Sequence, residues 1–140
     1  MGSDKRTYVF AYGTLKPGGR YHKSYCCGFN FEVQVATIEG KLFYFPKLGY
    51  PAAMEASDSS IRGCLFNFRN SEFEVLSKLD ELEGYDPNRH ANTNEYYRKK
   101  VIVYNASGAK VDKRAWCYFM ERITIEKLGG VLIPTGYWAI

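Results

Sequence analysis

One carboxylate in the sequence falls where a charge would be costly, which makes it the first candidate for catalysis. The segment Glu72 to Glu83 predicts a helix, because Ser71 and Glu74 form a capping-box pattern at its start and Gly84 follows its end. At about 100° per residue, Glu83 lies near the middle of the apolar face of this helix. That face is formed by Phe73, Val75, Leu76, Leu79 and Leu82.

Two interpretations of Glu83 follow from this position. In the first, the side chain reaches solvent at the frayed end of the helix and has no chemical role. In the second, burial and the negative end of the helix dipole both raise its pKa toward neutrality. A carboxyl group with such a pKa can take a proton from one group and later give it to another. Asp80 shares the apolar face less centrally, whereas Glu74, Lys78 and Glu81 face solvent.

A glycine-containing loop is the second candidate. Tyr8 to Tyr12 is a short apolar run that predicts a buried strand, and Tyr12-Gly13-Thr14-Leu15 stands where this strand ends. Such loops can direct successive backbone N–H groups at an anion. The residues match neither the dinucleotide-binding nor the phosphate-loop pattern, and ordinary turn chemistry stays open as the alternative. For Tyr96-Tyr97-Arg98, cross-strand packing is the alternative to a place in a pocket.

No residues point to a metal or cofactor. Neither the four cysteines, at 26, 27, 64 and 117, nor the two histidines, at 22 and 90, show metal-ligand or redox spacing. Four cysteines are also too few for a disulfide scaffold of this size. We therefore expect reduced thiols and a protein that works without a cofactor.

Length and composition indicate one folded domain over residues 1–140, with residues 1–5 disordered or derived from expression. The chain has 140 residues, a net charge of +4 and 16% aromatic residues, so it can fold around one core. Its longest apolar run has about five residues against the ~18–20 of a membrane-spanning helix, and no leader pattern opens it. We expect a cytoplasmic protein with no membrane association.

The elements that must position these candidates are mostly strands. Alternating or continuous apolar runs bounded by Gly and Pro predict them, and the most secure is a hairpin across a Gly-containing connection. Gly63 marks a bulge or a close backbone approach, and Gly49-Tyr50-Pro51 is a loop. The expected strands are Tyr8–Tyr12, Phe31–Ile38, Lys41–Phe45, Ile61–Phe68, Glu95–Tyr104 and Val111–Met120, followed by a short closing segment, Val131–Ile140.

Charge is distributed in two opposed patches. Residues 94–114 hold six Lys or Arg and two acids, whereas residues 71–86 hold six acids and one Lys. The patches can pair with each other. The basic residues beside Tyr96, Tyr97, Trp116 and Tyr118 also raise a rival interpretation, a β-barrel that binds single-stranded nucleic acid. The acidic helix and the lack of an RNP-type motif disfavour it, so we expect no nucleic-acid partner.

Taken in order, the motifs resemble the γ-glutamyl cyclotransferase-like (AIG2-like) family over nearly the whole chain. The motifs are Tyr12-Gly13-Thr14-Leu15, Gly49-Tyr50-Pro51, the helix end Leu79 to Tyr85, Tyr96-Tyr97-Arg98 and Gly136-Tyr137-Trp138. The resemblance implies an α+β fold, a small mixed β-barrel with flanking helices. It also implies an enzyme without metal or cofactor that releases 5-oxoproline from γ-glutamyl compounds. Tyr137 departs from the pattern, in which an aspartate before the Trp is more usual.

The same resemblance assigns roles to individual residues. The catalytic glutamate falls on Glu83, the substrate-binding loop on Tyr12, Gly13, Thr14 and Leu15, and a pocket tyrosine on Tyr96. The expected partner is a small γ-glutamyl substrate, whose α-amine attacks its own γ-carbonyl while Glu83 acts as base and then acid. A non-catalytic binder of the same fold is the alternative. The leaving amine, the choice between Tyr96 and Tyr97, and the oligomeric state stay open.

Overall fold

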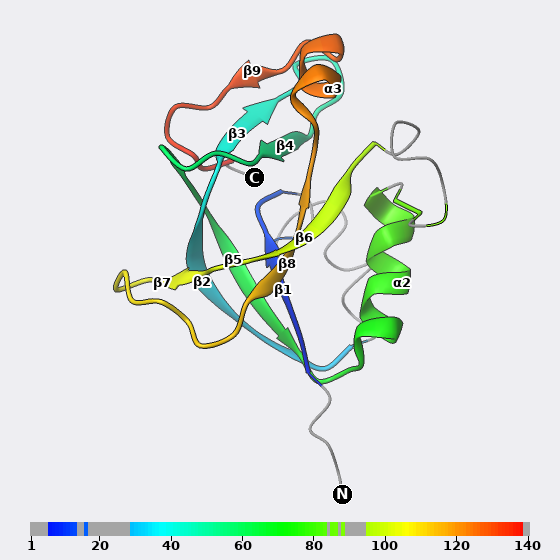
Figure 1. Ribbon diagram of the computed structural model, residues 1–140, viewed down its shortest axis with the longest axis vertical. Helices are drawn as coiled ribbons and strands as arrows, with labels where there is room; N and C mark the ends of the chain where they lie inside the picture. The colour runs from blue at the N-terminus through cyan, green and yellow to red at the C-terminus, as the bar shows by residue number, and fades with distance from the viewer. Residues whose placement is uncertain are drawn as a thin grey trace, which may run out of the picture.

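The computed structural model describes residues 6–13, 16, 29–83, 85, 86, 88 and 95–138. Within these residues, nine strands form one mixed sheet that curls into a half-barrel, with two helices beside it (Figure 1). The predicted α+β fold, a small mixed barrel with flanking helices, is therefore confirmed. The elements are β1 (Thr7–Ala11), β2 (Phe31–Glu39), β3 (Lys41–Tyr44), β4 (Pro51–Met54), β5 (Ser60–Phe68), α2 (Glu72–Glu83), β6 (Tyr97–Val101), β7 (Tyr104–Asn105), β8 (Ala115–Phe119), α3 (Arg122–Lys127) and β9 (Val131–Leu132).

The sheet joins strands that are far apart in the sequence. Its order is β7-β2-β5-β1-β8-β4-β3-β9, and β6 also pairs with β8. Most pairs are antiparallel, but β8 runs parallel to both β1 and β4. Strand β1 thus lies in the middle of the sheet. The residues at its carboxyl end lie near Tyr50 and Tyr96.

Strand alternation divides the apolar side chains between two cores. Phe10 and Leu65 face each other across β1 and β5 and belong to the core inside the curled sheet. Their neighbours Val9 and Phe66 point to the opposite face, where they join Leu79 and the other buried residues of α2. The core on this opposite face therefore holds α2 against β1. This packing helps to position Glu83 at the end of α2.

Helix α2 has the bounds that the sequence predicts. Its capping box is present, because the Glu74 amide donates to Ser71 Oγ and the Ser71 amide donates to the Glu74 carboxylate, each at 3.3 Å. Val75, Leu76 and Leu79 are buried. The expectation for Phe73 is wrong, since its side chain is 83% exposed. Phe73 lies at the edge of the apolar arc, where the sheet no longer covers the first turn.

The predicted hairpin is confirmed. Strands β6 and β8 pair antiparallel as expected, from Tyr97 opposite Phe119 to Val101 opposite Ala115. Beyond Val101 the hairpin continues up to its turn, because Tyr104 forms an antiparallel bridge with Lys110 and the Val111 amide donates to the Val103 carbonyl oxygen at 2.8 Å. Strand β7 also pairs with β2. A tight turn at Asn105–Gly108, with Gly108 at φ +86°, reverses the chain.

Two further elements were not predicted. Strand β4 begins at the proline that we took as part of a loop, and its alanines carry little strand signal. Helix α3 has six residues with one buried side chain, Ile125, and its isoleucines and threonine are typical of strands. Among the described residues, no helix has both the length and the apolar character needed to cross a membrane.

Gly63 is a site of close backbone approach, as its place inside β5 predicts. A Cβ atom at this position would lie 2.4 Å from the carbonyl oxygen of Ala11. Only glycine allows β1 and β5 to approach at this point without displacement of the backbone. The approach sets the position of the carboxyl end of β1, immediately before Tyr12.

Candidate active site

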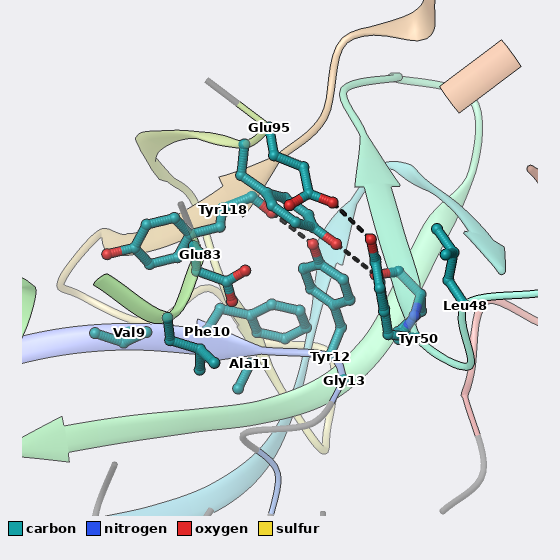
Figure 2. Close-up of a pocket in the computed structure, with 13 residues that line it drawn as sticks. Val9, Phe10, Ala11, Tyr12, Gly13, Leu48, Tyr50, Glu83, Glu95 and Tyr118 are labelled. Carbon is teal, nitrogen blue, oxygen red and sulfur yellow. Dashed lines mark hydrogen bonds between the residues drawn. The ribbon is translucent and has the colours of Figure 1, made fainter. Parts of the chain in front are cut away.

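A pocket of about 220 Å³ lies at the carboxyl end of β1 (Figure 2). Strand β1 and the last turn of α2 form one part of its wall, and segments around Tyr50, Glu95 and Tyr118 form the rest. A cavity of this size suits a small molecule. The lining residues are Val9, Phe10, Ala11, Tyr12, Gly13, Leu48, Tyr50, Pro51, Leu82, Glu83, Glu95, Tyr96 and Tyr118.

Glu83 is the last residue of α2 and lines this pocket. Its side chain is partly buried rather than extended into solvent. Burial raises the pKa of Glu83 from 4.5 to about 8, and the nearby charges of Glu95 and Asp80 contribute to the increase. The carboxyl group is thus protonated near neutral pH but loses its proton within the range in which a general base operates.

The last turn of α2 is held in place by Asp80, one turn before Glu83. Arg98 of β6 donates to Asp80 through Nε at 2.9 Å and Nη2 at 3.3 Å, and the Tyr118 hydroxyl donates to the same carboxylate. The Arg98 guanidinium also lies over the rings of Tyr85 and Trp116. Both side chains of the ion pair are largely buried, at 18% and 14% exposure. This network joins α2 to β6 and β8 and thereby positions Glu83.

We expect Arg98→Met to lower the free energy of unfolding by about 2–3 kcal/mol. The substitution keeps the aliphatic stem but leaves Asp80 without its partner in a largely buried position, where loss of one ion costs up to ~3–5 kcal/mol. Urea denaturation at neutral pH measures the change. Lys99→Met is the matched control, because Lys99 pairs with Glu55 at the exposed surface and should change stability by only ~0.5 kcal/mol. Equal effects of the two variants would contradict this role.

The glycine-containing loop is described in part. The Tyr12 ring lines the pocket, and its hydroxyl donates to the Tyr118 carbonyl oxygen at 2.7 Å, which ties the end of β1 to β8. Gly13 packs closely against the next segment, since a Cβ atom there would lie 2.8 Å from Pro51 Cγ. The Gly13 carbonyl oxygen accepts from the Lys16 amide at 3.0 Å, as in a turn. Thr14 and Leu15 lie outside the described residues.

Lys16 anchors the far end of this turn, a role that no sequence pattern indicates. Its side chain is only 3% exposed. The ammonium group donates to the Trp138 carbonyl oxygen and lies 4.1 Å from the centroid of the Tyr137 ring. Burial lowers the pKa of Lys16. The carboxyl-terminal segment that contains Tyr137 thus holds the turn that follows the pocket.

The structure also separates Tyr96 from Tyr97. Tyr96 is buried and lines the pocket, and its hydroxyl donates to the Pro51 carbonyl oxygen at 3.0 Å. Tyr97 is the first residue of β6 and its hydroxyl donates to Glu55, away from the pocket. Of the two tyrosines that the sequence left open, only Tyr96 contributes to the pocket wall.

Sequence reasoning missed the second carboxylate of the pocket. Glu95 accepts a hydrogen bond from the Tyr50 hydroxyl at 2.6 Å, and both side chains line the pocket beside Leu48. In the sequence, Glu95 stood at the start of a predicted strand with no pattern around it. Only its place directly before Tyr96 could have indicated a functional position.

The opposed charged patches pair with each other in three dimensions. Besides Arg98 with Asp80, Lys100 lies 3.4 Å from Glu72, which also accepts from the Trp116 indole at 2.8 Å. Lys99 pairs with Glu55. Three consecutive basic residues of β6 are thus engaged in ion pairs across the surface.

Two of the four cysteines lie among the described residues. Cys64 and Cys117 are free thiols, and burial raises the pKa of both. No three His, Cys, Asp or Glu side chains in this part of the chain are grouped so that they could hold a metal ion. Cys26, Cys27, His22 and His90 lie outside the described residues.

Sequence comparison gives matches over most of the chain. The model of the family described as gamma-glutamyl cyclotransferase, AIG2-like, matches residues 9–139. A relative from Methanocaldococcus jannaschii, provisionally named a gamma-glutamylcyclotransferase, is 29% identical over 130 residues, and the match covers 92% of each chain. The resemblance inferred from the motifs is therefore confirmed.

Solved structures share the fold. An AIG2-like protein from Mus musculus matches with a TM-score of 0.73 at 16% identity, over 96% of this chain and 89% of that one. YkqA from Bacillus subtilis matches with a TM-score of 0.64 at 21% identity, over 95% of this chain. This chain spans only 39% of the length of YkqA. At such identities the likeness shows the fold alone.

Proposed function

Because the chain belongs to the AIG2-like gamma-glutamyl cyclotransferase family, we propose that it is an enzyme that releases 5-oxoproline from a γ-glutamyl amine or amino acid. The observation that carries the proposal is Glu83, a carboxyl group with a pKa of about 8 in the wall of a small pocket. A carboxyl group with this pKa can exchange protons with an amine near neutral pH. The reaction needs no redox step.

The proposed reaction is an intramolecular transfer of an acyl group. The α-nitrogen of the γ-glutamyl group attacks the γ-carbonyl carbon, and the bond between that carbon and the leaving nitrogen breaks. The ring that forms is 5-oxoproline. The α-ammonium nitrogen loses two protons in the reaction, and the leaving nitrogen takes up two, so that it departs as an ammonium ion. Since both reacting groups belong to one molecule, the pocket needs only to hold a folded conformer of the substrate, which supplies much of the barrier reduction.

Glu83 serves both proton transfers in this proposal. The α-amine arrives protonated and cannot attack until ionised Glu83 removes its proton. The leaving nitrogen must be protonated before it departs, and Glu83 returns the first proton to it. The second proton, which the α-nitrogen loses as the ring closes, passes to the free amine. Glu83 thus ends the cycle in the ionisation state in which it began. One carboxyl group can serve both transfers if its pKa lies near the pH of the reaction. Burial of Glu83 meets this condition.

Tyr96 and the loop after β1 would position the substrate. The Tyr96 hydroxyl donates to Pro51, so its oxygen is available to accept a hydrogen bond from the substrate ammonium. Tyr12 and Gly13 lie at the same end of β1, and we propose that N–H groups of the loop Tyr12 to Leu15 bind the α-carboxylate or the oxyanion. The substrate would then lie between Glu83 and these donors.

A mixed panel of γ-glutamyl amines and γ-glutamyl amino acids tests the proposal. We expect wild-type protein to release 5-oxoproline from at least one member of the panel, detected by mass spectrometry, with no added metal or cofactor. The preferred member identifies the leaving group. If folded protein binds a panel member without releasing 5-oxoproline, the chain is a non-catalytic binder, and the proposed activity is wrong.

A further inference from the structure

Glu95 places a second negative charge in the pocket that the proton cycle of Glu83 does not require. Its carboxylate is held by the Tyr50 hydroxyl at 2.6 Å, and it lies close enough to Glu83 to raise the pKa of that residue. Glu95 itself is exposed. A carboxylate that is fixed by a hydrogen bond and open to solvent can meet a ligand at the mouth of the pocket.

Among the described residues, no cation in the lining of the pocket neutralises this charge. The described residues of the lining include two glutamates but neither lysine nor arginine. Arg98, the nearby cation of β6, is engaged with Asp80. The pocket therefore favours an occupant with positive charge and disfavours a carboxylate beside Glu95.

Glu83 and Glu95 lie on different sides of the pocket. Figure 2 shows Glu83 on the side of β1, with Val9, Phe10 and Ala11, and Glu95 on the other side with Tyr50 and Leu48. A γ-glutamyl group whose nitrogen reaches Glu83 must direct its leaving amine toward the open side of the pocket. There, Leu48 is 41% exposed and forms an apolar wall with the Tyr50 ring.

We propose that Glu95, held by Tyr50, selects γ-glutamyl amides whose leaving amine carries a second positive charge at the end of an aliphatic chain. The chemical class is the monoamide of a diamine. The methylene groups would pack on Leu48 and Tyr50, while the terminal ammonium would pair with Glu95. The inference rests on the proposed function and adds a specificity-determining residue to it.

The test uses three series of γ-glutamyl amides that differ only at the far end of the leaving amine. With spacers of three to five carbons, the end is an ammonium, a methyl or a carboxylate group. For the wild-type protein we expect kcat/KM for the ammonium series to exceed the methyl series by about 10-fold, and the carboxylate series to be lowest. The preference should weaken as salt is added, since Glu95 is exposed.

Glu95→Gln should remove the discrimination. Loss of the Glu95 charge also acts on Glu83, and this affects all three series alike. We therefore expect the ratio of kcat/KM between the ammonium and methyl series to fall by about 10-fold, and the ratio between the carboxylate and methyl series to rise. Glu126→Gln, which removes an exposed charge from α3, is the control and should keep the wild-type order. An equal loss in all three series would overturn the inference, because it would place the α-ammonium rather than the leaving group at Glu95.

Binding separates this inference from the proposed function. Glu83→Gln keeps Glu95 and should bind the intact amides without turnover, so calorimetry on this variant reports the preference directly. If wild-type protein releases no 5-oxoproline but the ammonium series still binds most tightly and loses that advantage in the Glu83→Gln, Glu95→Gln double variant, only the proposed function is wrong. Equal affinity for all three series contradicts the role of Glu95.

Discussion

Replacement of Glu83 by Gln is expected to lower 5-oxoproline release by about 10²–10⁴-fold. Gln keeps the size of the side chain but can neither remove the proton from the α-amine nor return it to the leaving nitrogen. The range is what general acid–base catalysis contributes. The measurement is kcat/KM by mass spectrometry on the best substrate of the panel.

Glu81→Gln is the matched control for this variant. Glu81 lies two residues earlier on α2 and is exposed, so its loss removes the same charge from the same helix without a change in the pocket. We expect wild-type activity from it, within about 2-fold, because exposed charges on a protein surface interact weakly. Wild-type activity in Glu83→Gln itself would remove Glu83 from the mechanism.

The second large effect of Glu83→Gln is on the stability of the protein. The substitution lowers activity but should raise stability at high pH. The pKa of Glu83 is raised from 4.5 to about 8 in the folded protein, so the folded state holds a proton that the unfolded chain releases between these values. The resulting stability is present below pH 4.5 and is lost as the pH rises through 8. At high pH, the wild-type protein must keep a partly buried charge.

Glu83→Gln should therefore become more stable than the wild type as the pH rises. We expect the two proteins to differ little near pH 4.5 and the variant to be more stable by about 2–4 kcal/mol above pH 8, after allowance for the opening of the pocket to water. Urea denaturation across this range gives the difference. Glu81→Gln should show no such trend, and a difference for Glu83→Gln that is constant with pH would contradict the raised pKa.

These two effects together indicate that Glu83 is maintained at a cost in stability. If Glu83 had only a structural role at the end of α2, its replacement would lower the stability of the protein. A residue that is kept for proton transfer instead gives lower activity and higher stability when its charge is removed. The pair of measurements thus distinguishes the two roles within one variant.

The sequence predicted those parts of the fold that depend on local patterns. Helix α2 and β5 follow directly from apolar spacing, the capping box and turn residues, because these signals act within a few residues. The course of β7 could not be predicted in this way. Besides its place in the hairpin, it pairs with β2, some 70 residues earlier, and no local pattern indicates that pairing.

The candidate site shows the same division. Glu83 was found because a carboxylate on an apolar helix face conflicts with its surroundings, and such a conflict is visible in one segment. Glu95 and Lys16 cause no local conflict. Their positions depend on Tyr50 and on Trp138, which reach them only after the chain has folded. Residues of this kind become recognisable in the structure, through the pocket and the hydrogen bonds that hold them.

Isotope labelling tests the central claim most directly. The best substrate of the panel is turned over by wild-type protein in ¹⁸O-enriched water, and all products that contain the γ-carbonyl carbon are analysed by mass spectrometry. Intramolecular attack of the α-amine predicts unlabelled 5-oxoproline with one equivalent of free amine and no glutamate. Release of glutamate that carries ¹⁸O in its γ-carboxyl group would show attack by water and would contradict a cyclotransferase mechanism.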